Sequence, residues 1–171
     1  MAGILVLGGC KSGKSSFAQC SAEKTGEKRL YVATGQATDE EMKDKIKKHR
    51  EERGAGWETS EVEFCLSDVI RRKNENYDVI LIDCITAWVT NLLIADRSFE
   101  AILDMVRDLE ESIEYTTCPV IMVSNEVGYG IVPMNSLARR FRDIAGLVNQ
   151  RIAEFSDEVI LTVAGIPTKT K

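Results

Sequence analysis

The residues most able to do chemistry lie near the N-terminus, in a glycine-rich loop. Residues 8 to 15 read GGCKSGKS, which fits the pattern G-x-x-x-x-G-K-[S/T]. In such a loop the glycines let backbone amides surround phosphate oxygens, the lysine reaches the β and γ phosphates, and the final hydroxyl binds Mg²⁺. The motif follows an apolar run and opens a helical pattern, which is the context it requires. It predicts nucleotide contacts from Gly8, Gly9, Cys10, Lys11, Ser12, Gly13, Lys14 and Ser15, with Lys14 catalytic and Ser15 a metal ligand.

A second candidate is Asp83, which follows the apolar run at residues 79 to 82. Ligands of open α/β sheets bind outside the carboxyl ends of the strands, and phosphate-loop folds place there a carboxylate that holds Mg²⁺ through water. Asp83 is therefore predicted to contact both the metal and the nucleotide. It is also a candidate base for a substrate hydroxyl, a role that competes with metal binding. The alternative is an ordinary turn aspartate.

His49 is the only histidine of the chain. On a helix it would lie almost two turns after Met42, close to the apolar stripe of Met42 and Ile46. The lysines and arginines around it should lower its pKa and keep the imidazole neutral. A neutral imidazole beside a bound polyphosphate is a nucleophile. The alternative is a solvated basic helix whose histidine has no chemical role.

Apolar runs and helical patterns alternate along the chain and must position these residues. The pattern predicts an α/β fold with a mostly parallel sheet, helices on both faces and an antiparallel C-terminal edge strand, in a single domain over residues 1–171. Ser136 is the expected N-cap of the last helix. We expect strands at 3–7, 29–33, 57–62, 79–82, 120–123, 159–163 and 165–171, and helices at 14–24, 39–53, 68–73, 86–95, 99–114 and 136–154.

Composition narrows the classes of protein that remain. The 171 residues carry a net charge of −5, which disfavours binding to long nucleic acids. No apolar run approaches the roughly 18 residues of a membrane span. No basic stretch precedes the first apolar run, and the five cysteines include no Cys-x-x-Cys pair. We therefore expect a cytoplasmic protein with reduced thiols, without a disulfide framework or a zinc site.

Several blocks in a fixed order make the sequence recognisable from end to end. It resembles the bifunctional adenosylcobinamide kinase/adenosylcobinamide-phosphate guanylyltransferase family of cobalamin biosynthesis. The matching blocks are GGxxSGKS at 8–15, YVAT at 31–34, DxEM at 39–42 leading to IxxHR at 46–50, WxTxE at 57–61, DCITxWxxNL at 83–92, SNEVGxGIVP at 124–133, RFRD at 140–143 and VAGIP at 163–167.

This resemblance implies a RecA-like phosphate-loop fold that assembles as a homotrimer. It also implies two reactions. A nucleoside triphosphate, GTP or ATP, phosphorylates adenosylcobinamide; GTP then donates GMP to that phosphate through a covalent GMP-histidine, which here can only be His49. Mg²⁺ would be held by Ser15 and Asp83. Beyond the phosphate loop, the implied nucleotide contacts are Ala33, Thr34, Gly35, Arg50, Glu51, Glu52, Arg53, Glu61 and Asp83. The chain departs from the family's usual pattern at Lys11, where relatives carry Arg, and at Gln19, where they often carry Glu.

Other classes of protein stay open at this point. One is a phosphate-loop kinase for a small molecule, without nucleotidyl transfer. Another is a RecA-like ATPase that depends on nucleic acid. A third is a nucleotide-binding switch with negligible chemistry. A covalent nucleotide on His49 would separate the bifunctional transferase from all three.

Overall fold

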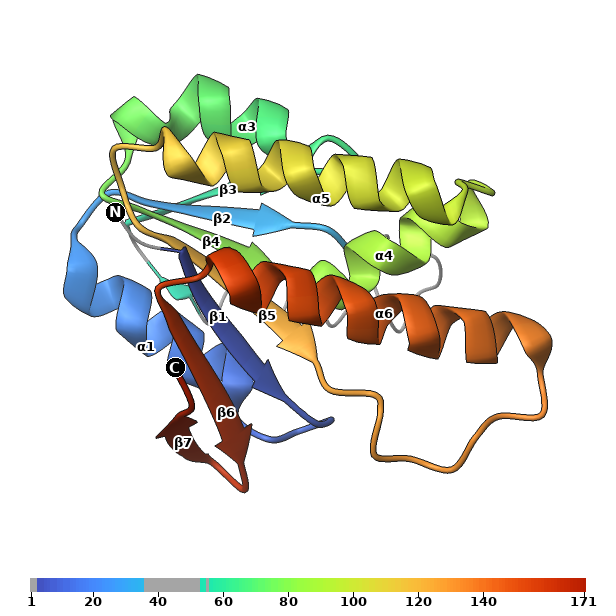
Figure 1. Cartoon of the computed structure of the whole chain (residues 1–171). Coiled ribbons are helices and arrows are strands. Elements are labelled where there is room, and N and C mark those ends of the chain that lie inside the picture. The colour runs from blue at the N-terminus through green and yellow to red at the C-terminus, as the bar shows by residue number, and fades with distance from the viewer. Residues whose placement is uncertain (1–2, 36–52, 55) are drawn as a thin grey trace.

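The computed structural model describes residues 3–35, 53–54 and 56–171, which form a seven-stranded sheet with helices on both faces (Figure 1). The strands are β1 (Gly3–Gly8), β2 (Arg29–Ala33), β3 (Trp57–Glu61), β4 (Val79–Asp83), β5 (Val120–Asn125), β6 (Glu158–Val163) and β7 (Ile166–Lys169). The helices are α1 (Lys14–Thr25), α3 (Leu66–Lys73), the 3₁₀ turn η1 (Asn74–Asn76), α4 (Ile85–Ile94), α5 (Phe99–Glu114) and α6 (Ser136–Phe155).

The strand order is β3-β2-β4-β5-β1-β6-β7. All neighbours pair in parallel except β6 and β7, which are antiparallel. The predicted parallel sheet with an antiparallel C-terminal edge strand is therefore confirmed. Ala164 and Gly165 form the turn before β7 with φ angles of 52° and 81°, the left-handed conformation that two-residue hairpins require.

Side chains that alternate along the central strands build two separate apolar cores. Leu5 packs in the larger core, whereas the next residue, Val6, packs in the smaller one. Consecutive strand residues point to opposite faces of a sheet, so the central strands contribute to both cores. The larger core lies beneath α3, α4, α5 and α6, and the smaller lies beneath α1 (Figure 1). Trp88 of α4 is 1% exposed, and its ring nitrogen donates to the Phe64 carbonyl at 2.6 Å.

Buried polar side chains hold the carboxyl end of β5 against α4 and α6. The Ser124 hydroxyl donates to Asn149 Oδ1 at 2.7 Å and lies 3.1 Å from the Thr86 hydroxyl. The Asn125 amide donates to Thr86 Oγ1 at 2.6 Å. Because buried polar groups are costly when unpaired, this network fixes the strand end in one position. The Glu126 amide then donates to the Gly8 carbonyl at 3.0 Å, which anchors the start of the phosphate loop.

The predicted boundaries differ from the observed ones by a few residues. The predicted helix at 68–73 begins earlier, at Leu66, and β5 continues to Asn125. The expected N-cap was wrong: Asn135, not Ser136, caps α6, because its side chain accepts a hydrogen bond from the Ala138 amide. The predicted helix at 39–53 lies outside the described residues, apart from Arg53.

Candidate nucleotide-binding site

The phosphate loop connects the end of β1 to the start of α1, as the sequence predicts. Gly13 is the N-cap of α1 with φ 93°, and its lack of a side chain leaves the first amides of the helix without a side-chain cap. Free amides and the positive end of the helix dipole favour an anion at this position. Lys11 also adopts a positive φ, 55°, so the loop curves tightly around its own centre. The backbone is therefore shaped to receive a phosphate group.

Two glycines of the loop are required by close packing against the β6–β7 hairpin. A Cβ at Gly8 would lie 2.7 Å from the Thr162 carbonyl oxygen, and a Cβ at Gly13 would lie 3.0 Å from Gly165 Cα. The Gly165 amide also donates to the Ser12 carbonyl at 2.8 Å. The β6–β7 hairpin therefore packs against the phosphate loop and restrains its backbone.

The Lys14 side chain folds back over the loop. Its ammonium donates to the Gly9 carbonyl at 3.2 Å. The ammonium group therefore lies within the loop that would surround the phosphates. Its three N–H donors can turn from the Gly9 carbonyl to phosphate oxygens without a large movement. This geometry fits the predicted role of Lys14 as a charge-neutralising residue.

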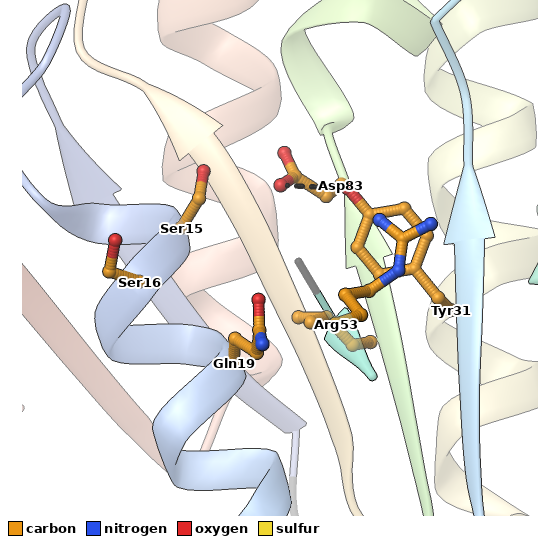
Figure 2. Close-up of a pocket in the computed structure, with 7 residues that line it drawn as sticks. Ser15, Ser16, Gln19, Tyr31, Arg53 and Asp83 are labelled. Carbon is orange, nitrogen blue, oxygen red and sulfur yellow. Dashed lines mark hydrogen bonds between the residues drawn. The ribbon is translucent and has the colours of Figure 1, made fainter. Parts of the chain in front are cut away.

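Facing Ser15 and Gln19 of α1, three side chains from other elements form the opposite wall of a cavity (Figure 2). The Tyr31 hydroxyl on β2 donates to Asp83 Oδ2 on β4 at 3.1 Å. The Arg53 guanidinium carbon lies 3.7 Å from the centre of the Tyr31 ring. The cavity encloses about 100 Å³ and is lined by Ser15, Ser16, Gln19, Tyr31, Arg53, Leu81 and Asp83.

The oxygen donors of this cavity fit Mg²⁺. Ser15 contributes a hydroxyl and Asp83 a carboxylate, both hard ligands. Among the described residues no cluster of three or more histidine, cysteine, aspartate or glutamate side chains could hold a metal alone. Mg²⁺ commonly binds through one or two protein oxygens together with substrate phosphates and water, so such a sparse donor set suits it better than zinc or calcium.

Burial sets the protonation of the groups around Asp83. Burial and the adjacent Asp83 raise the pKa of Tyr31 above its ordinary value, although Arg53 opposes the shift. Tyr31 therefore remains a hydrogen-bond donor throughout the neutral range. Burial, with Asp83 as a second cause, raises the pKa of Cys84 to about 11. Since only a thiolate is nucleophilic, Cys84 is a poor nucleophile near neutral pH.

The predicted contact segment of Ala33, Thr34 and Gly35 is held beside Asp83. The Thr34 hydroxyl donates to the Cys84 carbonyl at 2.6 Å and accepts from the Cys84 amide at 2.8 Å. Asn91 Nδ2 donates to the Thr34 carbonyl at 2.8 Å. These bonds fix the backbone that leaves β2, while Gly35 stays exposed.

Of the other residues predicted to contact the nucleotide or to react with it, the structure describes only some. Glu61 is exposed at the end of β3 and pairs in register with Ala33, at the same sheet edge as Asp83. Arg53 is buried against Tyr31. His49, Arg50, Glu51 and Glu52 lie outside the described residues. The sequence patterns did not predict that Tyr31 contacts Asp83. Its place in the YVAT block was the available signal, but the block alone does not say what the tyrosine contacts.

Together these features first define a class of protein. A phosphate loop between β1 and α1, an aspartate at the end of β4 and a largely parallel sheet make an α/β phosphate-loop fold of the RecA-like type. Solved structures agree. Flagellar accessory protein FlaH from Methanocaldococcus jannaschii matches 99% of this chain and 78% of its own, with a TM-score of 0.57 at 18% identity. The RadB recombinase matches 94% of this chain and 73% of its own, with a TM-score of 0.55 at 14% identity.

Sequence relatives then give the family. The model of the cobinamide kinase / cobinamide phosphate guanyltransferase family matches residues 4–170. The bifunctional adenosylcobalamin biosynthesis protein CobU of Salmonella typhimurium strain LT2 is 44% identical over 98% of this chain and 99% of its own. The corresponding protein CobP of Pseudomonas aeruginosa is 41% identical over 98% of this chain and 96% of its own. The chain therefore belongs to the cobinamide kinase / cobinamide phosphate guanyltransferase family.

Family membership confirms the predicted resemblance and the predicted enzyme class, a nucleotide-using transferase of cobalamin biosynthesis. It disfavours a kinase without nucleotidyl transfer, because the family is described by both activities. The likeness to the two solved structures extends to the fold alone. None of the described helices is both long and apolar enough to cross a membrane.

Proposed function

We propose that this chain performs both reactions of its family at the sheet edge formed by the phosphate loop and Asp83, with His49 carrying the guanylyl group. One observation supports the location above all. Ser15, Asp83 and Arg53 line one cavity, although they come from three separate segments of the chain. Arg53, which lines this cavity, is also only four residues after His49 in the sequence.

In the kinase step, the hydroxyl of adenosylcobinamide attacks the γ-phosphorus of GTP or ATP. A new P–O bond forms, the bond to the β-phosphate oxygen breaks, and the nucleoside diphosphate leaves. The loop amides and Lys14 neutralise charge and align the phosphates, which is the main protein contribution to phosphoryl transfer. Asp83 is the candidate acceptor for the hydroxyl proton, a role that competes with its binding of the metal.

In the guanylyl step, neutral His49 attacks the α-phosphorus of GTP. A P–N bond forms and pyrophosphate leaves. An oxygen of adenosylcobinamide phosphate then attacks the same phosphorus, the P–N bond breaks, and adenosyl-GDP-cobinamide forms. Lys14 stabilises the charge of the departing pyrophosphate. Ser15 and Asp83 would hold Mg²⁺, which supplies further charge neutralisation at the phosphates.

The nucleotide contacts proposed here follow the predicted set: the phosphate loop, residues 33–35, residues 50–53, Glu61 and Asp83. We also propose a homotrimeric, cytoplasmic enzyme that does not act on nucleic acid. The net charge of −5 supports the last point, because nucleic-acid binding depends on neutralising phosphates with basic side chains.

The kinase reaction and the guanylyltransferase reaction can be separated by substitution. His49→Asn should abolish guanylyl transfer and leave phosphorylation of adenosylcobinamide within about twofold of the unmodified enzyme. Lys14→Ala should impair both reactions, because both use the same loop. The two products are measured by liquid chromatography of the corrinoids. Retained guanylyl transfer in His49→Asn would overturn the assignment of the carrier, and an unaffected kinase in Lys14→Ala would overturn the shared loop.

A further inference from the structure

We propose that Tyr31 is a positioning residue that holds the Asp83 carboxylate in the orientation required for binding the metal–nucleotide complex. The inference deepens the proposed function, on which it rests. Tyr31 itself would not touch the reacting atoms. Its hydroxyl acts through Asp83, to which it donates a hydrogen bond of 3.1 Å.

Strand register brings these two residues together. Tyr31 on β2 pairs with Leu81 on β4, and Ala33 pairs with Asp83. Tyr31 and Asp83 are therefore diagonal neighbours on one face of two adjacent strands. The tyrosine is long enough to reach along this face, so its hydroxyl meets the carboxylate at the carboxyl end of β4 (Figure 2).

The ring of Tyr31 is enclosed on several sides and cannot easily turn away. Tyr31 is 8% exposed. The Arg53 guanidinium stacks over the ring at 3.7 Å, and the Trp57 ring lies edge-on with its centre 6.1 Å away. Arg53 is further held through Nη2, which donates to the Thr59 hydroxyl at 3.4 Å. A ring fixed in this way can hold its hydrogen-bond partner in one orientation.

The hydrogen bond has a direct consequence for the carboxylate. Only one oxygen of Asp83 can face the Tyr31 hydroxyl, so the bond restricts rotation of the carboxylate about its last single bond. Asp83 and Ser15 line the same cavity from opposite walls. A fixed carboxylate lowers the entropy lost when both groups bind one cation, which is the benefit of preorganisation.

Tyr31→Phe is the decisive variant, because it removes the hydroxyl and keeps the ring that packs against Arg53 and Trp57. Mn²⁺ affinity, measured by electron paramagnetic resonance in the presence of a GTP analogue with a methylene bridge between the α and β phosphates, which cannot lose pyrophosphate to His49, should weaken about tenfold, as expected for loss of a hydrogen bond to a charged group. The readout does not depend on turnover. Circular dichroism reports whether the variant is folded.

Tyr77→Phe is the matched control. The Tyr77 hydroxyl interacts with the Glu58 carboxylate and lowers its pKa, and neither residue lines this cavity. This variant also loses a tyrosine hydroxyl that interacts with a carboxylate, and it should bind Mn²⁺ like the unmodified protein. If both variants weaken Mn²⁺ binding equally, the effect is general destabilisation and the positioning role is refuted.

A double-mutant cycle tests whether Tyr31 acts through Asp83. In an Asp83→Ala background, Tyr31→Phe should change Mn²⁺ affinity by less than about twofold, because no side-chain oxygen remains for Tyr31 to orient. An undiminished tenfold effect in that background would overturn the proposal. Failure of the unmodified protein to bind the nucleotide analogue at all would instead refute the proposed function, so the two failures are distinguishable.

Discussion

Replacing Gly8 with alanine would insert a methyl group where the phosphate loop meets the C-terminal hairpin. The new Cβ would lie 2.3 Å from Ser12 Oγ and 2.7 Å from the Thr162 carbonyl oxygen. The Ser12 hydroxyl can rotate away. The carbonyl belongs to β6, which pairs with β1 along its length, so it cannot move without distorting the sheet. The phosphate loop must then shift.

Overpacking of this kind costs about 1–3 kcal/mol. In a domain of this size each kcal/mol lowers the melting temperature by roughly 2–4 °C, so the variant should melt roughly 2–12 °C lower. A displaced loop also turns its amides away from the phosphates. GTP affinity should therefore fall at least about tenfold, the equivalent of 1.4 kcal/mol.

Gly9→Ala is the matched control, because a Cβ at Gly9 meets no atom within 4 Å. Differential scanning calorimetry gives the melting temperatures, and titration calorimetry gives the affinity for GTP. Gly9→Ala should melt within about 1 °C of the unmodified protein, as expected for a substitution without a steric conflict. Equal melting temperatures for the two variants would refute the claim that the hairpin restrains the loop.

Two further predictions concern stability away from the loop. Asn91→Ala should lower the free energy of unfolding by about 1–3 kcal/mol, because it removes the side-chain amide that donates to the Thr34 and Glu63 carbonyls. Urea denaturation measures this loss, and replacement of the exposed Asn76 by alanine should not change the free energy of unfolding in the same way. Hydrogen bonds from the Lys28 and Glu27 amides lower the pKa of Asp78, so its contribution to stability is complete above the ordinary aspartate pKa of about 4 and is lost as pH falls through the lowered value in the folded protein. Asp78→Asn should therefore flatten the acid limb of a melting-temperature profile below about pH 4, and an unchanged limb would contradict this account.

The sheet and the phosphate loop could be predicted from local signals. Buried parallel strands read as short apolar runs, and the loop motif fixes what lies before and after it. The run at residues 79–82 followed by Asp83 therefore located both β4 and its carboxylate. An edge strand is also predicted at residues 165–171, and β7 (Ile166–Lys169) confirms it.

Contacts between distant segments could not be read in the same way. The Tyr31–Asp83 hydrogen bond depends on β2 lying beside β4, a strand order that no local pattern encodes. Bracing of the phosphate loop by Gly165 likewise joins residues more than 150 positions apart in the sequence. The predicted N-cap of α6 was wrong for a local reason. Asn135 and Ser136 are both good N-cap residues, and the choice between them depends on where the preceding loop enters the helix.

The proposed guanylyl transfer requires that His49 become covalently guanylylated. Intact-protein mass spectrometry after exposure to GTP and Mg²⁺ tests it most directly, with peptide mapping at neutral or alkaline pH to preserve a P–N bond. We expect the added mass of one GMP unit on the peptide that contains His49, and no added mass on His49→Asn. A GMP unit retained by His49→Asn, or an unmodified enzyme that still forms adenosyl-GDP-cobinamide without any adduct, would contradict it.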